Sequence, residues 1–416
     1  MRAPKGMLDV LPPESDRWIE LATRFAARAA RFGYGLLLTP IVEHYVVFQR
    51  IGETTDVVSK EMYEFVDRGG RHLALRPEGT APVARAFVEH RPPVPWKVWY
   101  LAPNFRAERP QAGRYRQHWQ VGAEVLGVDD PDVDVEMISL LAGFYRDLGL
   151  RDVTLLLNSM GDTETRSRYR EVLLAHWRAH AKLLGDELAR AEVNPLRILD
   201  SKRPDWQQVI EQAPMLSDYM TDEAATRFTR VQEGLTALGL PFTVAPRLVR
   251  GLDYYTSILF EYQSAAFDAS QNAIGGGGRY DHLVEEMGGP PTPSIGFGAG
   301  VERILLACEA ENVLSPPTAR VEVFVVVAAE TSDAVTLVDD LREHGFATDR
   351  SYGGRSLKRQ MAAANASGAA WTVILGEKEA ARGMVAVKNM ASGEQCEVSR
   401  EQLVAWLQEQ KGNEPQ

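Results

Sequence analysis

Residues 115–126 read YRQHWQVGAEVL, and the alternation along this run predicts a long β-strand with two different faces. One face is mostly apolar and carries Tyr115, Gln117, Trp119, Val121, Ala123 and Val125. The opposite face carries Arg116, His118, Gln120, Gly122 and Glu124. Polar side chains in the middle of a long strand indicate a functional site, because buried polar groups that lack partners cost stability.

The residues before this strand complete a β-hairpin. A strand is predicted over 96–102 and continues through 103–106, and a polar loop spans 107–114. The loop is flanked by four arginines, namely Arg106, Arg109, Arg114 and Arg116. The planar guanidinium group pairs well with phosphate oxygens, so the loop end of the hairpin is suited to an anion.

Length and composition are those of a soluble globular protein with two or three domains. The chain has 416 residues, 45% of them hydrophobic, and a net charge of −11, which argues against a protein coated in nucleic acid. No apolar run approaches the roughly 18 residues that span a membrane, and the N-terminus does not resemble a signal peptide. The two cysteines, Cys308 and Cys396, offer neither metal-ligand spacing nor a disulfide framework, so we expect a reducing cytoplasm.

The hydrophobic pattern divides the chain into three regions. The first contains predicted helices at 14–32, near 81 and at 131–148, and strands at 36–43, 153–158 and 257–262. The second, from 161 to 238, is helical, and we expect Trp177 and Trp206 in its core. The third alternates strands at 321–328, 346–350, 370–375, 384–389 and 395–398 with helices at 332–344, 356–366 and 400–410. That alternation predicts a small α/β domain with a mostly parallel sheet.

Two further segments carry polar residues that are typical of sites. Residues 250–255, Arg-Gly-Leu-Asp-Tyr-Tyr, stand directly before a predicted strand. They can line a substrate site, or Arg250 and Asp253 can form a structural salt bridge. Glu78 and Thr80 stand where another strand turns into a helix, and they can hold an ammonium group. Alternatively, Thr80 is only the N-cap of that helix.

Glycine-rich and basic segments complete the set of candidates. Residues 275–278 are four glycines, which predicts either a loop at a phosphate or substrate, or a flexible link. Residues 294–303 pass from an extended segment into a helix with Arg303, and a helix N-terminus favours anions. They lack the ending of a P-loop and the spacing of a dinucleotide fingerprint. A basic run over 350–359 is either a solvated helix face or a contact for nucleic acid, and it contains Arg350, Arg355, Lys358 and Arg359.

In this combination and order, the segments resemble the histidyl-tRNA synthetases, a family of class II aminoacyl-tRNA synthetases. The resemblance covers almost the whole chain, beginning with residues 4–12. The segment around Pro40 is similar to class II motif 1, residues 105–124 to motif 2, and residues 296–303 to motif 3. Residues 76–80 and 250–255 are similar to segments that are specific to the histidyl members.

The resemblance implies an α+β catalytic domain on a six-stranded antiparallel sheet, formed by residues 1–160 and 241–315. It also implies an inserted helical domain at 161–240 and an anticodon-binding α/β domain at 320–416. The expected partners are ATP, histidine, the histidine tRNA and a second copy of the chain. The dimer seam is expected at motif 1.

The reaction implied by the resemblance has two steps. Histidine and ATP form histidyl-adenylate and pyrophosphate, and the histidyl group then passes to the 3′ end of the tRNA. Arg106 and Arg250 are expected to hold the α-phosphate, with Arg250 where other class II enzymes commonly place a metal ion. Arg114 and Arg303 are expected at the outer phosphates, which Mg²⁺ would bridge, and no other metal is expected.

The resemblance also assigns the adenine contacts. Glu108 is similar to the acid that binds the adenine amino group. The family usually has phenylalanine and then histidine where this chain has His118 and Trp119, so His118 is the ring expected to stack on adenine. Because an imidazole buries less area than a phenyl ring, the affinity for ATP is expected to differ.

Histidine and tRNA complete the implied site. Glu78, Thr80 and Gln120 are expected at the α-amino group of histidine, and Glu124 and Tyr255 at its imidazole nitrogens. Asp253 is expected to orient its neighbours, while Leu252 and Tyr254 pack beneath the site. The acceptor end of the tRNA is expected at Arg109 and Gln111, and its anticodon stem near the basic run 350–359.

Two other functions account for parts of the pattern. Some paralogues of the family are histidine-sensing regulatory subunits of the first enzyme of histidine biosynthesis. They generally lack the anticodon-binding domain and lose the motif that this chain has at 250–255. We expect this chain to have both the domain and the motif. A nucleotide-binding scaffold would leave the polar strand face with Gln120 and Glu124 unexplained. ATP–pyrophosphate exchange with each amino acid separates the three functions.

Overall fold

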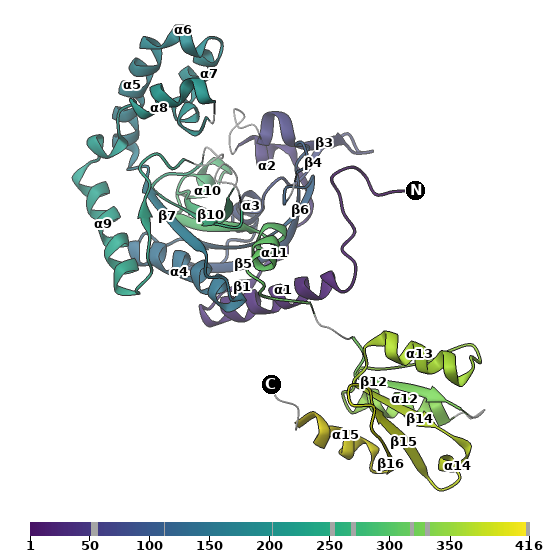
Figure 1. Ribbon diagram of the computed structural model, residues 1–416. Coiled ribbons are helices and arrows are strands. Elements are labelled where there is room, and N and C mark those ends of the chain that lie inside the picture. Colours follow the sequence, from purple (N-terminus) through teal and green to yellow (C-terminus); the bar gives the residue numbers. More distant parts are fainter. Residues whose placement is uncertain are drawn as a thin grey trace. The chain divides into compact units, whose positions relative to one another are not determined.

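The computed structural model describes residues 1–50, 57–111, 113–201, 203–249, 254–267, 272–316, 320–328 and 333–412. They form two compact units, Met1–Ser315 and Pro316–Gln416 (Figure 1). Among the described residues, no helix combines the length and the apolar composition that a membrane crossing requires.

The first unit is organised around an eight-stranded sheet in the order β1-β5-β6-β11-β10-β9-β7-β8. Six central strands run antiparallel to their neighbours, namely β5 (Trp96–Phe105), β6 (Gln117–Leu126), β11 (Ser294–Gly300), β10 (Ala273–Arg279), β9 (Ile258–Ser264) and β7 (Val153–Ser159). Two-residue strands extend the edges in parallel, β1 (Gly35–Leu36) and β8 (Thr243–Val244). The predicted α+β fold on a six-stranded antiparallel sheet is confirmed, with one short strand added at each edge.

The apolar face of β6 packs against helices. One core cluster joins side chains of α1 (Glu14–Arg31), α4 (Pro131–Leu148) and α11 (Val301–Ala310) to Val121, Ala123 and Val125. Figure 1 shows α1 and α4 together on one side of the sheet. Trp18 of α1 meets Trp119 edge-on, with ring centroids 6.0 Å apart. The alternation of β6 therefore places the helix-covered core on one face and leaves the other for polar groups.

The opposite face of the sheet is covered by shorter helices. They are α2 (Tyr45–Gln49), α3 (Thr80–His90) and α10 (Leu283–Glu286). The π-helical turn η1 (Val57–Glu61), which follows α2 in the chain, contributes Val58 to the same layer. Their apolar side chains form a second cluster with Tyr100, Tyr254 and Tyr280. Gln120 and Glu124 lie on this face, so the predicted site is enclosed between the sheet and α3.

Two predictions for this unit are wrong. The predicted strand at 36–43 is divided between β1 and β2 (Val42–His44), and β2 joins a separate sheet with β4 (His72–Leu75) and β3 (Tyr63–Val66). Pro40 has no N–H to continue a ladder, which explains the break. Residues 275–278 are neither a loop nor a link but part of buried β10. A Cβ on Gly277 would lie 1.9 Å from the carbonyl oxygen of Gly296, so glycine permits the close strand pairing.

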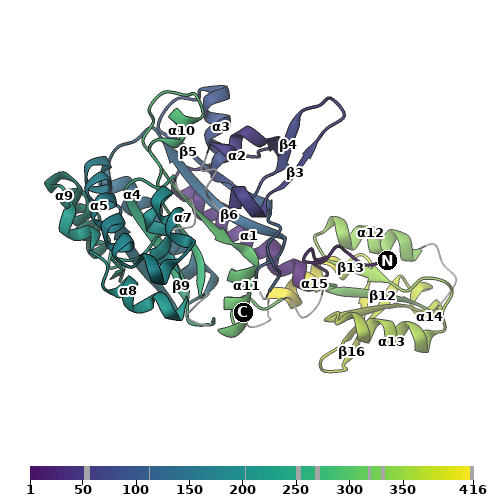
Figure 2. The ribbon, with the colours of Figure 1, turned by 90° about the horizontal axis from the view of Figure 1, so that it is seen from above.

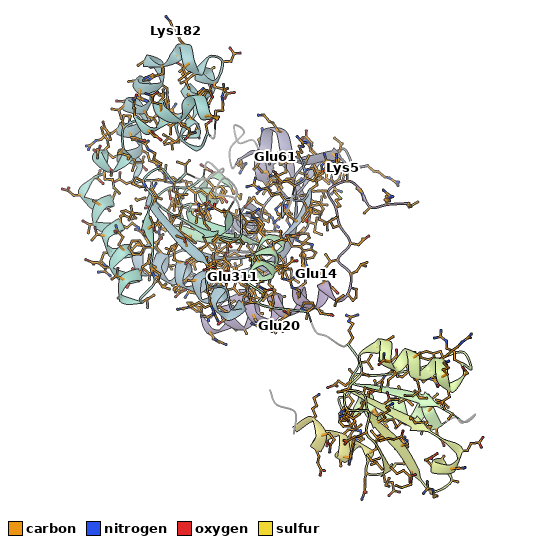
Figure 3. All side chains as sticks on the ribbon, viewed as in Figure 1. Lys5, Glu14, Glu20, Glu61, Lys182 and Glu311 are labelled. Carbon is orange, nitrogen blue, oxygen red and sulfur yellow. The ribbon has the colours of Figure 1, made fainter. Side chains whose placement is uncertain are left out.

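Residues 163–237 form what we call the helical segment. Its helices are α5 (Thr163–Ala179), α6 (Ala181–Leu184), α7 (Glu187–Val193), η2 (Pro195–Asp200), η3 (Pro204–Trp206), α8 (Gln207–Glu211), η4 (Leu216–Tyr219) and α9 (Asp222–Ala237). Trp177 and Trp206 are buried in a core cluster of this segment, as predicted. Figure 3 shows Lys182 of α6 at the outer end of the segment. That these residues are an inserted domain stays a prediction.

The second unit contains a five-stranded sheet in the order β13-β12-β14-β15-β16. Its strands are β12 (Val323–Val327), β13 (Thr348–Arg350), β14 (Trp371–Leu375), β15 (Met384–Asn389) and β16 (Gln395–Ser399). β12 is parallel to both of its neighbours, whereas β15 is antiparallel to both of its own. The prediction of a mostly parallel sheet is therefore wrong. The short connections that enter and leave β15 cannot carry a parallel crossover, which needs a dozen or more residues.

Helices cover both faces of the second sheet. α12 (Asp333–Glu343) and α15 (Leu403–Gly412) pack on one face, while α13 (Leu357–Ser367) packs on the other. Figure 2 shows α12 and α13 on opposite sides of the strands. A short helix, α14 (Glu377–Ala380), lies between β14 and β15 in sequence. The basic run 350–359 leads from the end of β13 into α13.

Candidate active site

Glu124 is the centre of the polar face of β6. Its side chain is fully buried, and one oxygen, Oε1, accepts hydrogen bonds from the Thr80 hydroxyl at 2.8 Å and the Tyr100 hydroxyl at 3.4 Å. The other oxygen, Oε2, accepts from the Tyr280 hydroxyl at 2.6 Å. Burial raises the pKa of Glu124 to about 8, although the hydrogen bonds from Tyr280 and Thr80 oppose the rise. Side chains of β6, α3 and β5, and of Tyr280 just after β10, therefore meet at one carboxyl group.

Small residues make room for this group. A Cβ on Gly296 of β11 would lie 1.4 Å from Oε2 of Glu124, so no larger residue fits at this position. Gly296 is the cross-strand partner of Glu124. The segment that contains β11 thus makes room for the Glu124 side chain by lacking a side chain of its own at Gly296.

Glu78 caps the helix that carries Thr80. Its two oxygens accept the backbone N–H groups of Thr80 and Ala81 at 2.7 and 2.8 Å. The reading of Thr80 as the N-cap is therefore wrong, since Gly79 holds that position and the Thr80 hydroxyl donates to Glu124. Burial raises the pKa of Glu78, and the two backbone N–H groups and the charge of Arg106 oppose the rise.

Gln120 lies between Glu124 and His118 on the same face. Its Oε1 accepts a hydrogen bond of 2.8 Å from the amide nitrogen Nδ2 of Asn104. Asn104 is fully buried and is the cross-strand partner of His118. Burial and then the nearby charge of Arg106 lower the pKa of His118 to about 3, so its ring is neutral at physiological pH. A neutral ring avoids the cost of burying a charge at this position.

Arg106 is half-buried where β5 ends. Its Nε donates to the carbonyl of Pro77 at 2.9 Å, which ties it to the segment of Glu78. The loop beyond Arg106 is braced by η1, because the carbonyl of Glu61, labelled in Figure 3, accepts the N–H of Ala107 at 2.7 Å. Glu108 is half-buried in this loop, and Arg109 and Gln111 are exposed.

Two more arginines lie close together, Arg303 in the first turn of α11 and Arg114 at the hairpin loop. Arg303 donates from Nε to the carbonyl of Ala273 at 2.6 Å, and its guanidinium lies 4.3 Å from the ring centroid of Phe267. Burial, and then the charge of Arg114, lower the pKa of Arg303. The charge of Glu261 opposes this effect.

Tyr255 and Arg250 close the list of predicted residues. Tyr255 is half-buried, and its ring lies 4.8 Å from that of Tyr254. Tyr254 is buried, as predicted, and its hydroxyl lies 3.5 Å from Oε2 of Glu78. Arg250, Leu252 and Asp253 lie outside the described residues, so the alternative of a salt bridge between Arg250 and Asp253 stays open.

Three residues that bond to Glu124 or Gln120 were not predicted from the sequence. Tyr100 and Asn104 share a face of β5, and the strand alternation that singled out Glu124 could have found them too. Tyr280 follows the glycines of β10, and no local pattern marks it because its partner is 156 residues away. Within the described ranges, no group of three or more His, Cys, Asp or Glu side chains is arranged to hold a metal ion.

Comparisons with known proteins show the family to which this chain is similar. The family model for histidyl-tRNA synthetase matches residues 6–304, and that for an anticodon binding domain matches residues 322–410. The chain is 46% identical to a histidine–tRNA ligase of Listeria innocua, covering 98% of each chain. It is 47% identical to one of Streptomyces coelicolor, covering 99% of this chain and 98% of the relative.

A solved structure gives the same result. Apo histidyl-tRNA synthetase of S. aureus superposes with a TM-score of 0.84 at 33% identity, covering 98% of this chain and 99% of that one. Because the family model spans most of the chain and the relatives match along its full length, this chain belongs to the histidyl-tRNA synthetase family, class II ligases that use ATP.

Proposed function

We propose that this chain joins histidine to its tRNA in two steps, with histidyl-adenylate as the intermediate. The observation that carries this proposal is the buried Glu124, which three hydroxyl groups surround on the polar face of β6. A buried acidic group of this kind suits the ring nitrogens of a histidine side chain. A scaffold that binds only a nucleotide would leave the buried polar contacts along this face of β6 unexplained.

The imidazole of histidine binds between Glu124 and Tyr255. The carboxyl group takes one ring nitrogen and the phenol takes the other. A substrate with an apolar side chain would leave both groups buried without partners, and sites of this type reject such analogues by roughly 10⁴-fold or more. This discrimination makes a separate editing domain unnecessary.

The α-amino group of histidine binds at Glu78, Thr80 and Gln120. The Thr80 hydroxyl donates to Glu124, and its lone pairs remain available to accept from an ammonium group. The oxygens of Glu78 each accept one backbone N–H, and a carboxylate oxygen can accept a second bond. Holding the ammonium end beside Glu124 sets the distance at which the imidazole must lie.

ATP lies along the loop end of the hairpin. Arg106 and Arg250 hold the α-phosphate, and Arg114 and Arg303 hold the outer phosphates. His118 stacks on the adenine ring, whose amino group Glu108 binds. Fixed guanidinium groups stabilise the charge that develops on the α-phosphate without any proton transfer. The half-buried position of Arg106 and the proximity of Arg114 and Arg303 support this assignment.

Mg²⁺ fits this site as a partner of ATP. The ion usually binds through substrate phosphates and water with one or two carboxylates. Glu261 lies close enough to raise the pKa of Arg303 through its charge, so a carboxylate is present beside the proposed phosphate site. When bound, the ion would neutralise charge on the outer phosphates.

Further partners follow from exposed groups. Arg109 and Gln111 are exposed on the hairpin loop and contact the acceptor end of the tRNA. The second unit, with the basic run 350–359, binds near the anticodon. The segment around Pro40 forms the seam of a homodimer, since it exposes the apolar residues Leu36, Leu38, Ile41 and Val42. The catalytic domain comprises residues 1–160 and 241–315, and the enzyme works in the cytoplasm.

ATP–pyrophosphate exchange, measured with each amino acid in turn, tests the proposal. We expect exchange with histidine alone. The regulatory-subunit alternative predicts histidine binding without exchange, and the scaffold alternative predicts neither. Exchange with another amino acid, or with none, would overturn the proposed activity.

A further inference from the structure

Within the first unit, the first and last helices of the helical segment meet beside the sheet and are linked by hydrogen bonds. Asp162 caps α5, since its Oδ1 accepts the N–H of Thr165 at 2.7 Å, and its Oδ2 accepts the hydroxyl of Thr221. Thr221 caps α9 and donates its own N–H to the hydroxyl of Thr165 at 3.1 Å. The starts of α5 and α9 are therefore held together at one place.

Arg166, one turn into α5, extends from this junction to the backbone of Tyr255 and Thr256. Its Nη1 donates to the carbonyl of Thr256 at 2.8 Å and to the carbonyl of Tyr255 at 3.3 Å. Burial lowers the pKa of Arg166, and the charges of Asp281 and Asp162 oppose that effect. The guanidinium group remains charged, and hydrogen bonds from a charged donor are stronger than neutral ones.

The same short stretch is held from the sheet. The N–H of Thr256 donates to the carbonyl of Arg279 at 2.8 Å, and its hydroxyl donates to Asp281 at 2.8 Å. The ring of Tyr255 packs against the core cluster of the helical segment. Tyr255 thus lies between the sheet and the helical segment, and the hydrogen bonds of the charged Arg166 side chain connect the two.

We propose that Arg166 is a positioning residue for histidine, because it couples the helical segment to the backbone of Tyr255. The inference rests on the proposed contact between Tyr255 and the substrate imidazole. The segment extends away from the sheet as far as Lys182 (Figure 3), so a tilt of the segment acts on the Tyr255 backbone through Arg166.

Arg166→Met tests the coupling, because it keeps an unbranched apolar stem and removes the guanidinium donors. We expect the KM for histidine in pyrophosphate exchange to rise about tenfold, while the KM for ATP stays within about twofold. Arg170→Met is the matched control. Arg170 lies on the same helix and also donates to two carbonyls, those of Val193 and Glu192 at 2.8 and 2.7 Å, but both belong to the helical segment. It should leave both KM values within about twofold of the parent.

Two further variants separate this inference from the proposed role of Tyr255. Tyr255→Phe should raise the KM for histidine, and the double variant with Arg166→Met should raise it little further, because the two changes act on one contact. Arg166→Lys should recover part of the loss, since an ammonium group reaches one carbonyl.

The outcomes that overturn the inference differ from one another. If Tyr255→Phe raises the KM for histidine and Arg166→Met behaves like Arg170→Met, the coupling is wrong and the role of Tyr255 stands. If Tyr255→Phe has no effect, both are wrong. Equal rises in both KM values would show a merely structural role for Arg166. Should Arg166→Met fail to fold, Arg166→Lys against Arg170→Lys gives the same comparison.

Discussion

Around Glu124, three hydroxyl groups already donate to one buried carboxyl group, whereas Arg114 and Arg303 hold two positive charges near each other. At Glu124, where we propose that histidine binds, a ligand would exchange hydrogen bonds with groups that are already paired. At the two arginines, where we propose that the outer phosphates bind, an anion would relieve the repulsion between like charges. Binding of histidine and binding of ATP should therefore respond differently to substitution, and the following changes test that difference.

The largest effect is expected from Glu124→Ala. The variant removes the proposed partner of the imidazole, so histidine-dependent pyrophosphate exchange should fall by roughly 10⁴-fold, the scale on which such sites reject analogues that leave buried groups unpaired. Circular dichroism should show an intact fold, because the variant removes a group whose burial is costly. Near-normal exchange would refute the assignment of Glu124.

The pH dependence of stability comes next. An unfolded glutamate ionises near pH 4.5, whereas Glu124 in the folded chain ionises near 8, so the folded state binds one more proton in between. Stability should therefore decline from about pH 4.5 to about pH 8 relative to Glu124→Gln, by at most about 5 kcal/mol, and level off above. Urea unfolding of both proteins across this range measures the difference, and parallel curves would contradict it.

Arg106→Ala should act mainly on the chemical step. Loss of one fixed cation at the developing charge should lower the rate of adenylate formation about 10²–10³-fold, with a much smaller change in histidine affinity. Arg250→Ala should behave in the same way. Single-turnover kinetics and histidine titration measure the two quantities, and equal losses in both would leave these arginines only a binding role.

The smallest effect is expected from Arg114→Gln. The KM for ATP should rise about tenfold, in line with the loss of one charged contact. Without ATP, the melting temperature should stay level or rise slightly, because Arg303 loses a like charge. Arg31→Gln, which removes an exposed charge from α1, is the control. A lower melting temperature with an unchanged KM would show that Arg114 is structural.

Local patterns were sufficient for much of the fold. The period of two along 117–126 separates the core face of β6 from the face of Gln120 and Glu124, because alternation is a property of a single strand. The helix predicted at 131–148 has those bounds in the structure, with Asp130 as its cap. Family resemblance, rather than any pattern of spacing, supplied the antiparallel order of the strands.

Other features depended on contacts that are distant in sequence. Glycine is a poor strand former, so residues 275–278 gave no sign of β10, whose glycines admit the neighbouring backbone. The cap at Glu78, by contrast, is local, since its partners are two and three residues away, and it was missed because Glu78 stands one residue before the N-cap position that Gly79 holds. Arg166 carries no sequence signal, since its partners are about 90 residues away.

The sequence by itself determined the polar strand face, the arginines of the hairpin loop and the membership of a family with Glu78, Thr80 and Glu124 in its motifs. These depend on alternation and on order along the chain. Only the tertiary structure decided that Thr80, Tyr100 and Tyr280 all bond to the carboxyl group of Glu124. The tertiary structure also sets the pKa of that group. The reason is that a pKa depends on burial and on neighbours brought from 24 to 156 residues away, and strand register sets both.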